Sequence, residues 1–168
     1  MNTRESQVFP IDDDSDSDSV AGLASVAISP DDRFVAASSR DMDVRIWDIA
    51  TRTLVHRLKG HAGVVSSIAF TPDGKGLVSC SEDKTLKYWE FSAALSDAHE
   101  TDEQFSKCTL DFTGHRGGVQ SVAISHDGQW IVSSLDNCGV QFWDRHGRTR
   151  LMLQGHHDFG TRLSLQVF

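Results

Sequence analysis

Short runs of alternating apolar and polar residues recur along the chain, and three of them end on a tryptophan followed by an acidic residue. They are Val44–Asp48, Leu86–Glu90 and Val140–Asp144. A period of two is typical of a strand that buries one face. The pattern therefore predicts an all-β chain built from short, half-buried strands.

The dipeptide Gly-His marks a repeat. It precedes a tryptophan by 28 residues twice, at His61 and at His115, and a third Gly-His ends at His156 with no tryptophan after it. Superposing the units on these marks aligns three segments: Ala24–Arg33, Ser66–Lys75 and Gln120–Gln129. Three repeat units are therefore visible, and we expect a fourth to begin near the C-terminus.

A period of about 40 residues with Gly-His and Trp-Asp marks resembles the WD40 repeat, in which each unit is a four-stranded propeller blade. Trp47 and Trp89 lie 42 residues apart, whereas Trp89 and Trp143 lie 54 apart. The excess falls in a polar stretch that we expect to be a loop insertion. The predicted fold is an incomplete WD40 β-propeller, with an acidic tail or loop over 1–19 and blades over 20–58, 59–110 (insertion near 92–106) and 113–153, followed by a stub over 154–168.

The resemblance implies a hydrogen-bond network inside the second blade. His61 is expected to bridge Asp83 in the turn between the second and third strands and Ser79 on the second strand. Ser79 is in turn expected to accept the indole N–H of Trp89, so that every donor has an acceptor. This network is structural and not catalytic.

The other two units depart from this pattern. The third keeps His115, Ser133 and Trp143, but Asn137 stands where the other units have an aspartate, so its network is weaker or its turn shifts by one residue. The first unit keeps only Asp41 and Trp47, since alanine replaces the strand serine. We expect the first blade to be held by packing alone.

Composition fits an ordinary domain, with 39% apolar and 24% charged residues. Closed propellers have about four to eight blades, so three blades and a stub leave three possibilities: a fragment, a truncated product, or an oligomer that completes the ring. Open edges predict marginal stability and self-association.

The net charge of −8 argues against nucleic acid and anionic membranes as partners. The acidic stretch Asp12–Ser19 is either a spacer or a phosphorylatable interaction segment.

Chemical motifs are not found. The Gly74-Lys75-Gly76 turn lacks the features of a phosphate-binding loop, and His156-His157-Asp158 belongs to the repeat frame. The three cysteines form neither a disulfide framework nor a metal pattern. No apolar run is long enough to cross a bilayer, and no signal peptide is visible. We expect an intracellular, non-catalytic protein without metal or cofactor.

Several stretches look like the propeller of the fungal Tup-type general transcriptional corepressors. They are 45–58, 70–79, 83–89, 139–144 and 151–156. That family also has a blade entered through an acidic segment without Gly-His, followed by a blade with a long insertion. The resemblance covers roughly residues 20 to 156 and implies a nuclear scaffold that binds DNA-bound repressors, histone tails and deacetylase-recruiting partners.

Peptides usually dock on the narrow face of a propeller, at the tops of the blades. By position, the candidate contacts are Ala24, Arg40, Ser66, Glu82, Gln120 and Asp136. Other hypotheses are an adaptor of another complex, such as a ubiquitin ligase or a signalling assembly in the cytoplasm, a sensor array appended to a nucleotide-hydrolysing domain, and a truncated fragment without function.

Overall fold

The computed structural model describes residues 22–91, 108–137 and 139–154. These residues contain no helix and form three four-stranded antiparallel sheets. The first sheet holds β1 (Leu23–Ile28), β2 (Phe34–Ser39), β3 (Val44–Asp48) and β4 (Leu54–Leu58). The second holds β5 (Val65–Phe70), β6 (Gly76–Ser81), β7 (Leu86–Glu90) and β8 (Cys108–Phe112). The third holds β9 (Val119–Ile124), β10 (Trp130–Leu135), β11 (Gly139–Asp144) and β12 (Thr149–Gln154).

Within each sheet the strands follow one another in chain order, so each sheet is a meander. The turn after the first strand has the same design in all three. Its third residue has positive φ, at Asp32 (57°), Gly74 (68°) and Gly128 (68°). Glycine adopts this conformation freely, and aspartate is among the residues that tolerate it. The aligned Pro-Asp-Asp, Pro-Asp-Gly and His-Asp-Gly segments therefore close equivalent turns.

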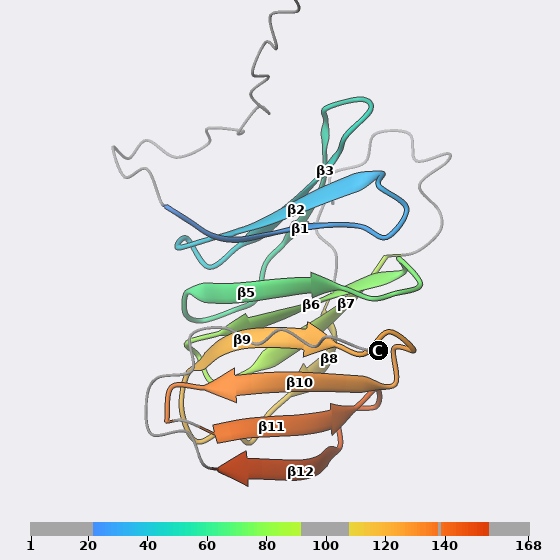
Figure 1. The fold of residues 1–168 in the computed structure, drawn as a ribbon. Coiled ribbons are helices and arrows are strands. Elements are labelled where there is room, and N and C mark those ends of the chain that lie inside the picture. The colour runs from blue at the N-terminus through green and yellow to red at the C-terminus, as the bar shows by residue number, and fades with distance from the viewer. Residues whose placement is uncertain (1–21, 92–107, 138, 155–168) are drawn as a thin grey trace, which may run out of the picture.

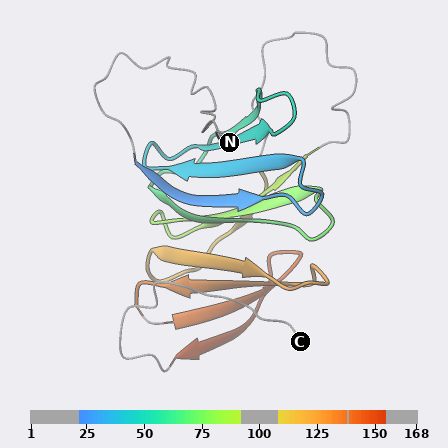
Figure 2. The same ribbon diagram turned by 45° about the horizontal axis from the view of Figure 1, so that its top comes forward.

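The sheets pack face to face. In Figure 1, β5 lies between β1 and β9, and Figure 2 keeps the same order. A core of buried residues joins the first sheet to the second: Ala36, Val44, Ile46, Leu58, Val65, Ile68, Leu77 and Trp89. Another joins the second to the third: Val78, Cys80, Leu86, Phe112, Val119, Val122, Ile131 and Trp143. Each sheet therefore relies on its neighbour to cover its apolar face, as predicted for propeller blades.

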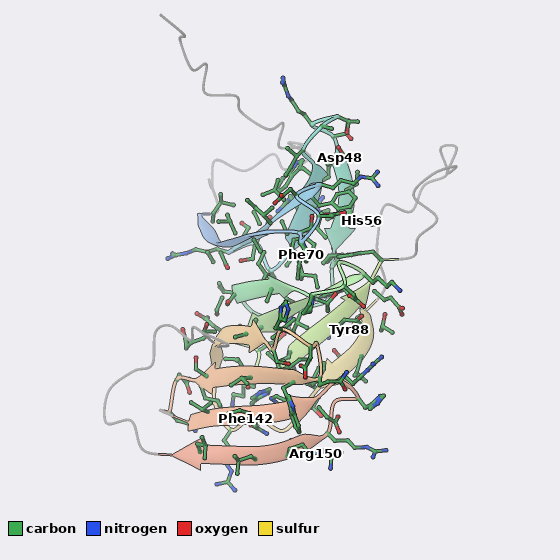
Figure 3. The ribbon with its side chains drawn as sticks, turned by 45° about the vertical axis from the view of Figure 1, so that its right-hand side comes forward. Asp48, His56, Phe70, Tyr88, Phe142 and Arg150 are labelled. Carbon is green, nitrogen blue, oxygen red and sulfur yellow. The ribbon has the colours of Figure 1, made fainter. Side chains whose placement is uncertain are left out.

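An aromatic contact closes the boundary between the first two sheets. His56 on β4 stacks on Phe91, with ring centroids 5.2 Å apart, and Phe91 lies 6.2 Å from Phe70 on β5. His56 and Phe70 are labelled in Figure 3 where the two sheets meet.

The three described sheets do not close into a ring, and their all-β blade architecture is the one that the sequence predicts. The predicted acidic tail over 1–19, the predicted insertion near 92–106 and residues 155–168 of the predicted stub lie outside the described residues.

Candidate functional site

The central contact of the second sheet is a chain of hydrogen bonds from an acid to an indole. His61 Nδ1 lies 2.8 Å from Asp83 Oδ2, and His61 Nε2 lies 2.8 Å from Ser79 Oγ. The indole N–H of Trp89 donates to Ser79 Oγ over 2.8 Å. The structure thus brings together the four residues that the resemblance implied. A neutral imidazole that donates from Nδ1 to the carboxylate and accepts the serine proton at Nε2 satisfies every group.

Burial and hydrogen bonding set the charges in this network. Burial lowers the pKa of His61, and the hydrogen bond from its Nδ1–H to Asp83 opposes that effect. Burial acts to raise the pKa of Asp83, but hydrogen bonds from Thr85, the Ala62 N–H and His61 outweigh it and lower that pKa to about 2. The acid is therefore ionised and the imidazole neutral near pH 7.

An acid, a histidine and a serine in this order also occur in nucleophilic triads. Ser79 differs because it is fully buried and its oxygen already accepts the indole N–H. A substrate has no access to such a hydroxyl. The arrangement fixes the turn between β6 and β7 against the loop before β5, since Asp83 Oδ2 also accepts the Ala62 N–H at 2.9 Å.

The third sheet keeps half of this network and replaces the rest. His115 Nε2 lies 3.0 Å from Ser133 Oγ, which accepts the Trp143 indole N–H over 3.1 Å. Asn137, which aligns with Asp83, is exposed, and His115 Nδ1 instead lies 3.0 Å from the backbone carbonyl oxygen of Lys84 in the second sheet. A bond across the sheet boundary replaces a bond to the sheet's own turn.

The aspartate one position earlier takes over the turn. Asp136 Oδ2 accepts the Gly118 N–H at 3.0 Å, whereas Asp83 accepts the N–H of Ala62, directly after the histidine of the second sheet. A Cβ on Gly117 would lie 1.9 Å from Asp136 Oδ1, so a larger residue there would have to displace the carboxylate that bonds Gly118. Sequence reasoning missed Gly117 and Gly118, although the Gly-Gly pair ahead of β9 was a visible signal for a close approach.

The first sheet is not held by packing alone, contrary to the prediction. Asp41 accepts a hydrogen bond from Arg45 Nη2 over 2.7 Å, and Asp43 accepts one from Arg57 Nε over 2.8 Å. Trp47 is 7% exposed. Arg45 on β3 thus holds Asp41, whereas a histidine holds the equivalent Asp83 in the second sheet, and Arg57 on β4 holds Asp43. Arg45 and Arg57 were the missed signal, since they lie directly opposite each other on these strands.

The candidate contact residues share one rim of the molecule. Figure 2 shows β1 and β9 running in the same direction, so the starting ends of the first strands lie on one side. At that end the backbone N–H groups of Arg40, Glu82 and Asp136 donate to the carbonyl oxygens of residues 22, 64 and 118. We call this end the upper rim. Arg40 and Glu82 are exposed, and Asp136 is half-buried.

Each of the other three candidates lies at a β-bulge on the upper rim. The register of the first strand against the second shifts between Leu23 and Ser25, between Val65 and Ser67, and between Val119 and Ser121. Ala24, Ser66 and Gln120 are the extra residues. Ala24 is exposed, and Ser66 and Gln120 are half-buried. Bulges re-aim side chains and are frequent beside binding sites.

The second and third sheets meet on this rim. A Cβ built on Gly118 would lie 3.3 Å from Asp136 Oδ2 and 3.4 Å from the Glu82 Cα, so the two acidic positions approach the same glycine. Arg40 belongs to the first sheet. The backbone of the rim therefore has the same geometry in all three sheets, whereas the side chains that it presents differ from sheet to sheet.

Other chemistry is not apparent in the part of the chain that the structure describes. No group of three or more His, Cys, Asp or Glu residues there has an arrangement suited to a metal ion. No described helix is long and apolar enough to cross a membrane. Burial raises the pKa of the Cys80 thiol. Burial, and to a smaller extent the hydrogen bond to the Asp111 carboxylate, raises the pKa of the Cys108 thiol to about 11. His156-His157-Asp158 lies outside the described residues.

The family model described as "WD domain, G-beta repeat" matches three segments of the chain: 15–48, 52–90 and 106–144. The segment 52–90 contains β4 to β7, and 106–144 contains β8 to β11. These repeats are therefore out of phase with the sheets by one strand. Each supplies the outer strand of one sheet and the three inner strands of the next, which ties neighbouring blades together.

Similar proteins include transcriptional repressors and a ribosome biogenesis protein. The chain is 55% identical over 51 residues to "Transcriptional repressor rco-1" of Neurospora crassa, and 40% identical over 52 residues to "General transcriptional corepressor TUP1" of Saccharomyces cerevisiae. It is 48% identical over 36 residues to "Ribosome biogenesis protein bop1" of Danio rerio.

These alignments cover only a small part of this chain and a smaller part of each relative. They cover 30%, 30% and 21% of this chain, and 8%, 7% and 5% of those proteins. The chain therefore matches less than a tenth of the length of each relative. The partial likeness to Tup-type corepressors that the sequence indicated is found, beside a likeness to another class of WD-repeat protein.

Three four-stranded meanders, the histidine-to-tryptophan network and three matches to the repeat model agree. This chain belongs to the WD40 repeat family.

Proposed function

We propose that this chain is a non-catalytic protein-interaction scaffold whose upper rim binds peptide segments, as part of a transcriptional corepressor propeller. The observation that carries the proposal is the repetition of one rim geometry in three sheets with different side chains on it. A repeated backbone with varied exposed side chains suits recognition of an extended partner along several blades. The similarity to "Transcriptional repressor rco-1" supports the corepressor assignment.

The proposed partners are DNA-bound repressors, histone tails and other corepressor subunits, and the proposed location is the nucleus. The net charge of −8 favours basic protein segments. Glu82 and Asp136 offer carboxylates on the upper rim where the second and third sheets meet. A lysine side chain of a partner lying over Gly118 would meet both.

The absence of catalysis is part of this proposal. The one acid-histidine-serine series of the second sheet has a buried serine, and its histidine is held between two partners. Its geometry suits a structural role.

An adaptor of another complex is the second candidate. The similarity to "Ribosome biogenesis protein bop1" supports it, because that match covers a fifth of this chain. Both candidates use the same rim and differ in the partner.

Binding of a lysine-rich peptide with the composition of a histone tail tests the rim. Fluorescence anisotropy should show at least about tenfold weaker binding for Glu82→Lys, since a like charge faces the peptide. The matched control is Glu90→Lys, an exposed acidic position on β7 away from the rim, and it should bind as the wild type does. Equal affinities for all three proteins would refute the rim as the binding site.

Fractionation of cells that express the tagged chain separates the two candidates. If the tagged chain is recovered in the chromatin fraction and the Glu82→Lys variant is not, the result supports the corepressor proposal. Recovery with pre-ribosomal particles on a sucrose gradient would instead support the adaptor.

A further inference from the structure

Three positions on the first strand of each sheet have the same role in the second and third sheets but not in the first. Val65, Ile68 and Phe70 pack in the core shared with the first sheet, and the aligned residues of β9, which are Val119, Val122 and Ile124, pack in the core shared with the second. Their counterparts on β1 are Leu23, Val26 and Ile28, which are 65%, 66% and 61% exposed. We call these three residues the leading face.

The orientation of β1 follows from its neighbour. Ala27 packs against the core between the first and second sheets. Because side chains alternate along a strand, Val26 and Ile28 point to the opposite side. The leading face is therefore apolar and lies on the side of the first sheet that no described sheet covers.

The third sheet carries the complementary surface. The leading positions of β9 are covered by residues of the second sheet that include Leu86 and Phe112, which are paired across β7 and β8. The equivalent pair on β11 and β12 is Val140 and Leu153. Leu153 is 48% exposed and Leu151 is 50% exposed. We call Val140, Phe142, Leu151 and Leu153 the trailing face; Figure 3 labels Phe142 on β11.

We propose that two copies of this chain associate by stacking the trailing face of each on the leading face of the other. The second copy is identified as the occupant by continuity with the two interfaces inside the chain. In both of them, the residues equivalent to the leading face pack against the residues equivalent to the trailing face. Such head-to-tail contacts close a ring when the rotation permits. The described sheets of two copies supply six blades, within the range of about four to eight that propellers adopt. This inference does not rest on the proposed function.

The pairing makes the two faces separable by mutation. Val26→Asp disables the leading face and Leu153→Asp disables the trailing face. Each places a carboxylate in an apolar contact, and each should raise the dimer dissociation constant at least about tenfold. Because every contact uses one face of each kind, either change alone removes both contacts of the ring. Ile49→Asp, at an exposed apolar position between β3 and β4, is the matched control and should leave dimerisation unchanged.

Size-exclusion chromatography with light scattering on the 168-residue chain measures the masses. We expect a wild-type dimer, a monomer for each single variant, and a dimer again when Val26→Asp and Leu153→Asp are mixed, since one intact trailing face then meets one intact leading face. Recovery on mixing also shows that both variants are folded. A wild-type monomer at all concentrations overturns the proposal. A dimer that Val26→Asp dissociates and Leu153→Asp does not also overturns it, because that result indicates pairing of two leading faces.

Discussion

At the scale of single residues, two buried serines connect the parts of their sheets. Ser79 and Ser133 each accept an indole N–H and each meet a histidine. The acid partner differs between the sheets, since Asp83 serves His61 and the Lys84 carbonyl serves His115. The serine and the tryptophan are the fixed elements, and the acceptor for histidine Nδ1 is variable.

Removing the Ser79 hydroxyl should destabilise the chain. Ser79→Ala leaves His61 Nε2 and the Trp89 indole N–H without their partner in a buried site, at about 1–3 kcal/mol for each unpaired group. Urea denaturation followed by tryptophan fluorescence measures the loss. The control is Ser67→Ala, at a half-buried position on the adjacent strand, which should stay within about 0.5 kcal/mol of the wild type. Equal effects of the two changes would argue against the network.

The buried histidines should make stability depend on pH. Burial lowers the pKa of both His61 and His115 in the folded chain, whereas the unfolded value is about 6.5. The unfolded chain therefore binds protons first, so the stabilisation is complete above about pH 6.5 and is lost as pH falls toward the lowered values.

Urea midpoints between pH 5 and pH 8 check this dependence. The urea concentration at the midpoint should decrease as the pH is lowered below about 6.5. His61→Gln should make this decrease smaller. His126→Gln serves as the control because His126 is exposed, and its profile should follow that of the wild type. A wild-type midpoint that rises on acidification would contradict the assignment.

At the scale of elements, backbone approach distances decide which strand positions accept a side chain. A Cβ on Gly76, at the start of β6, would lie 2.7 Å from the Tyr88 ring and 2.8 Å from the Trp89 carbonyl oxygen. A Cβ on Gly22, before β1, would meet nothing within 4 Å. Two glycines beside strand starts thus have different steric requirements, because one faces the next strand at close range and the other does not.

Alanine scanning of these two glycines tests that difference. Gly76→Ala should cost about 1–3 kcal/mol, because neither the ring nor the adjacent backbone can move aside freely. Gly22→Ala should change stability by less than about 0.5 kcal/mol. Thermal melting of both variants is the measurement. A neutral Gly76→Ala would show that β6 and β7 can separate without cost.

The sequence predicted which segments pair into sheets, because alternation and turn residues are local signals. It did not predict how the first sheet replaces its missing histidine. Arg57 on β4 reaches Asp43 only because β3 and β4 pair in a particular register. Register depends on the whole hairpin, so such contacts follow from tertiary structure.

At the scale of the whole molecule, stability is shared between neighbouring sheets. Phe112 is fully buried in the core between the second and third sheets, and its ring meets that of Trp143 edge to face at 5.6 Å. In repeat proteins each unit is stabilised by its neighbours, so an interface residue couples the two units it joins.

Phe112→Ala should uncouple the third sheet from the second. We expect a loss of about 3–5 kcal/mol, from the transfer and cavity terms. Hydrogen exchange measured by mass spectrometry should show lost protection in β9 to β11, while β2 and β3 keep more of theirs. Uniform loss of protection in all three sheets would indicate a single cooperative unit.

The rim residues show the limit of sequence reasoning at this scale. The alignment placed Arg40, Glu82 and Asp136 at equivalent positions, and the structure gives their N–H groups equivalent acceptors. The bulges at Ala24, Ser66 and Gln120 were not visible in the sequence, because a bulge is a mismatch between two strands and is not a property of either one.

The sequence by itself determined the all-β class and the three blades, since repeat spacing and strand alternation are recorded in the order of residues, and its resemblance to the WD40 repeat implied the residues of the second blade's network. Only the tertiary structure decided that His115 turns to the Lys84 carbonyl of the neighbouring sheet and that Asn137 stays outside. It also decided which apolar side chains are covered. Leu23, Val26 and Ile28 are as apolar as their counterparts Val65, Ile68 and Phe70, and they differ in exposure because burial depends on a second sheet packing against them.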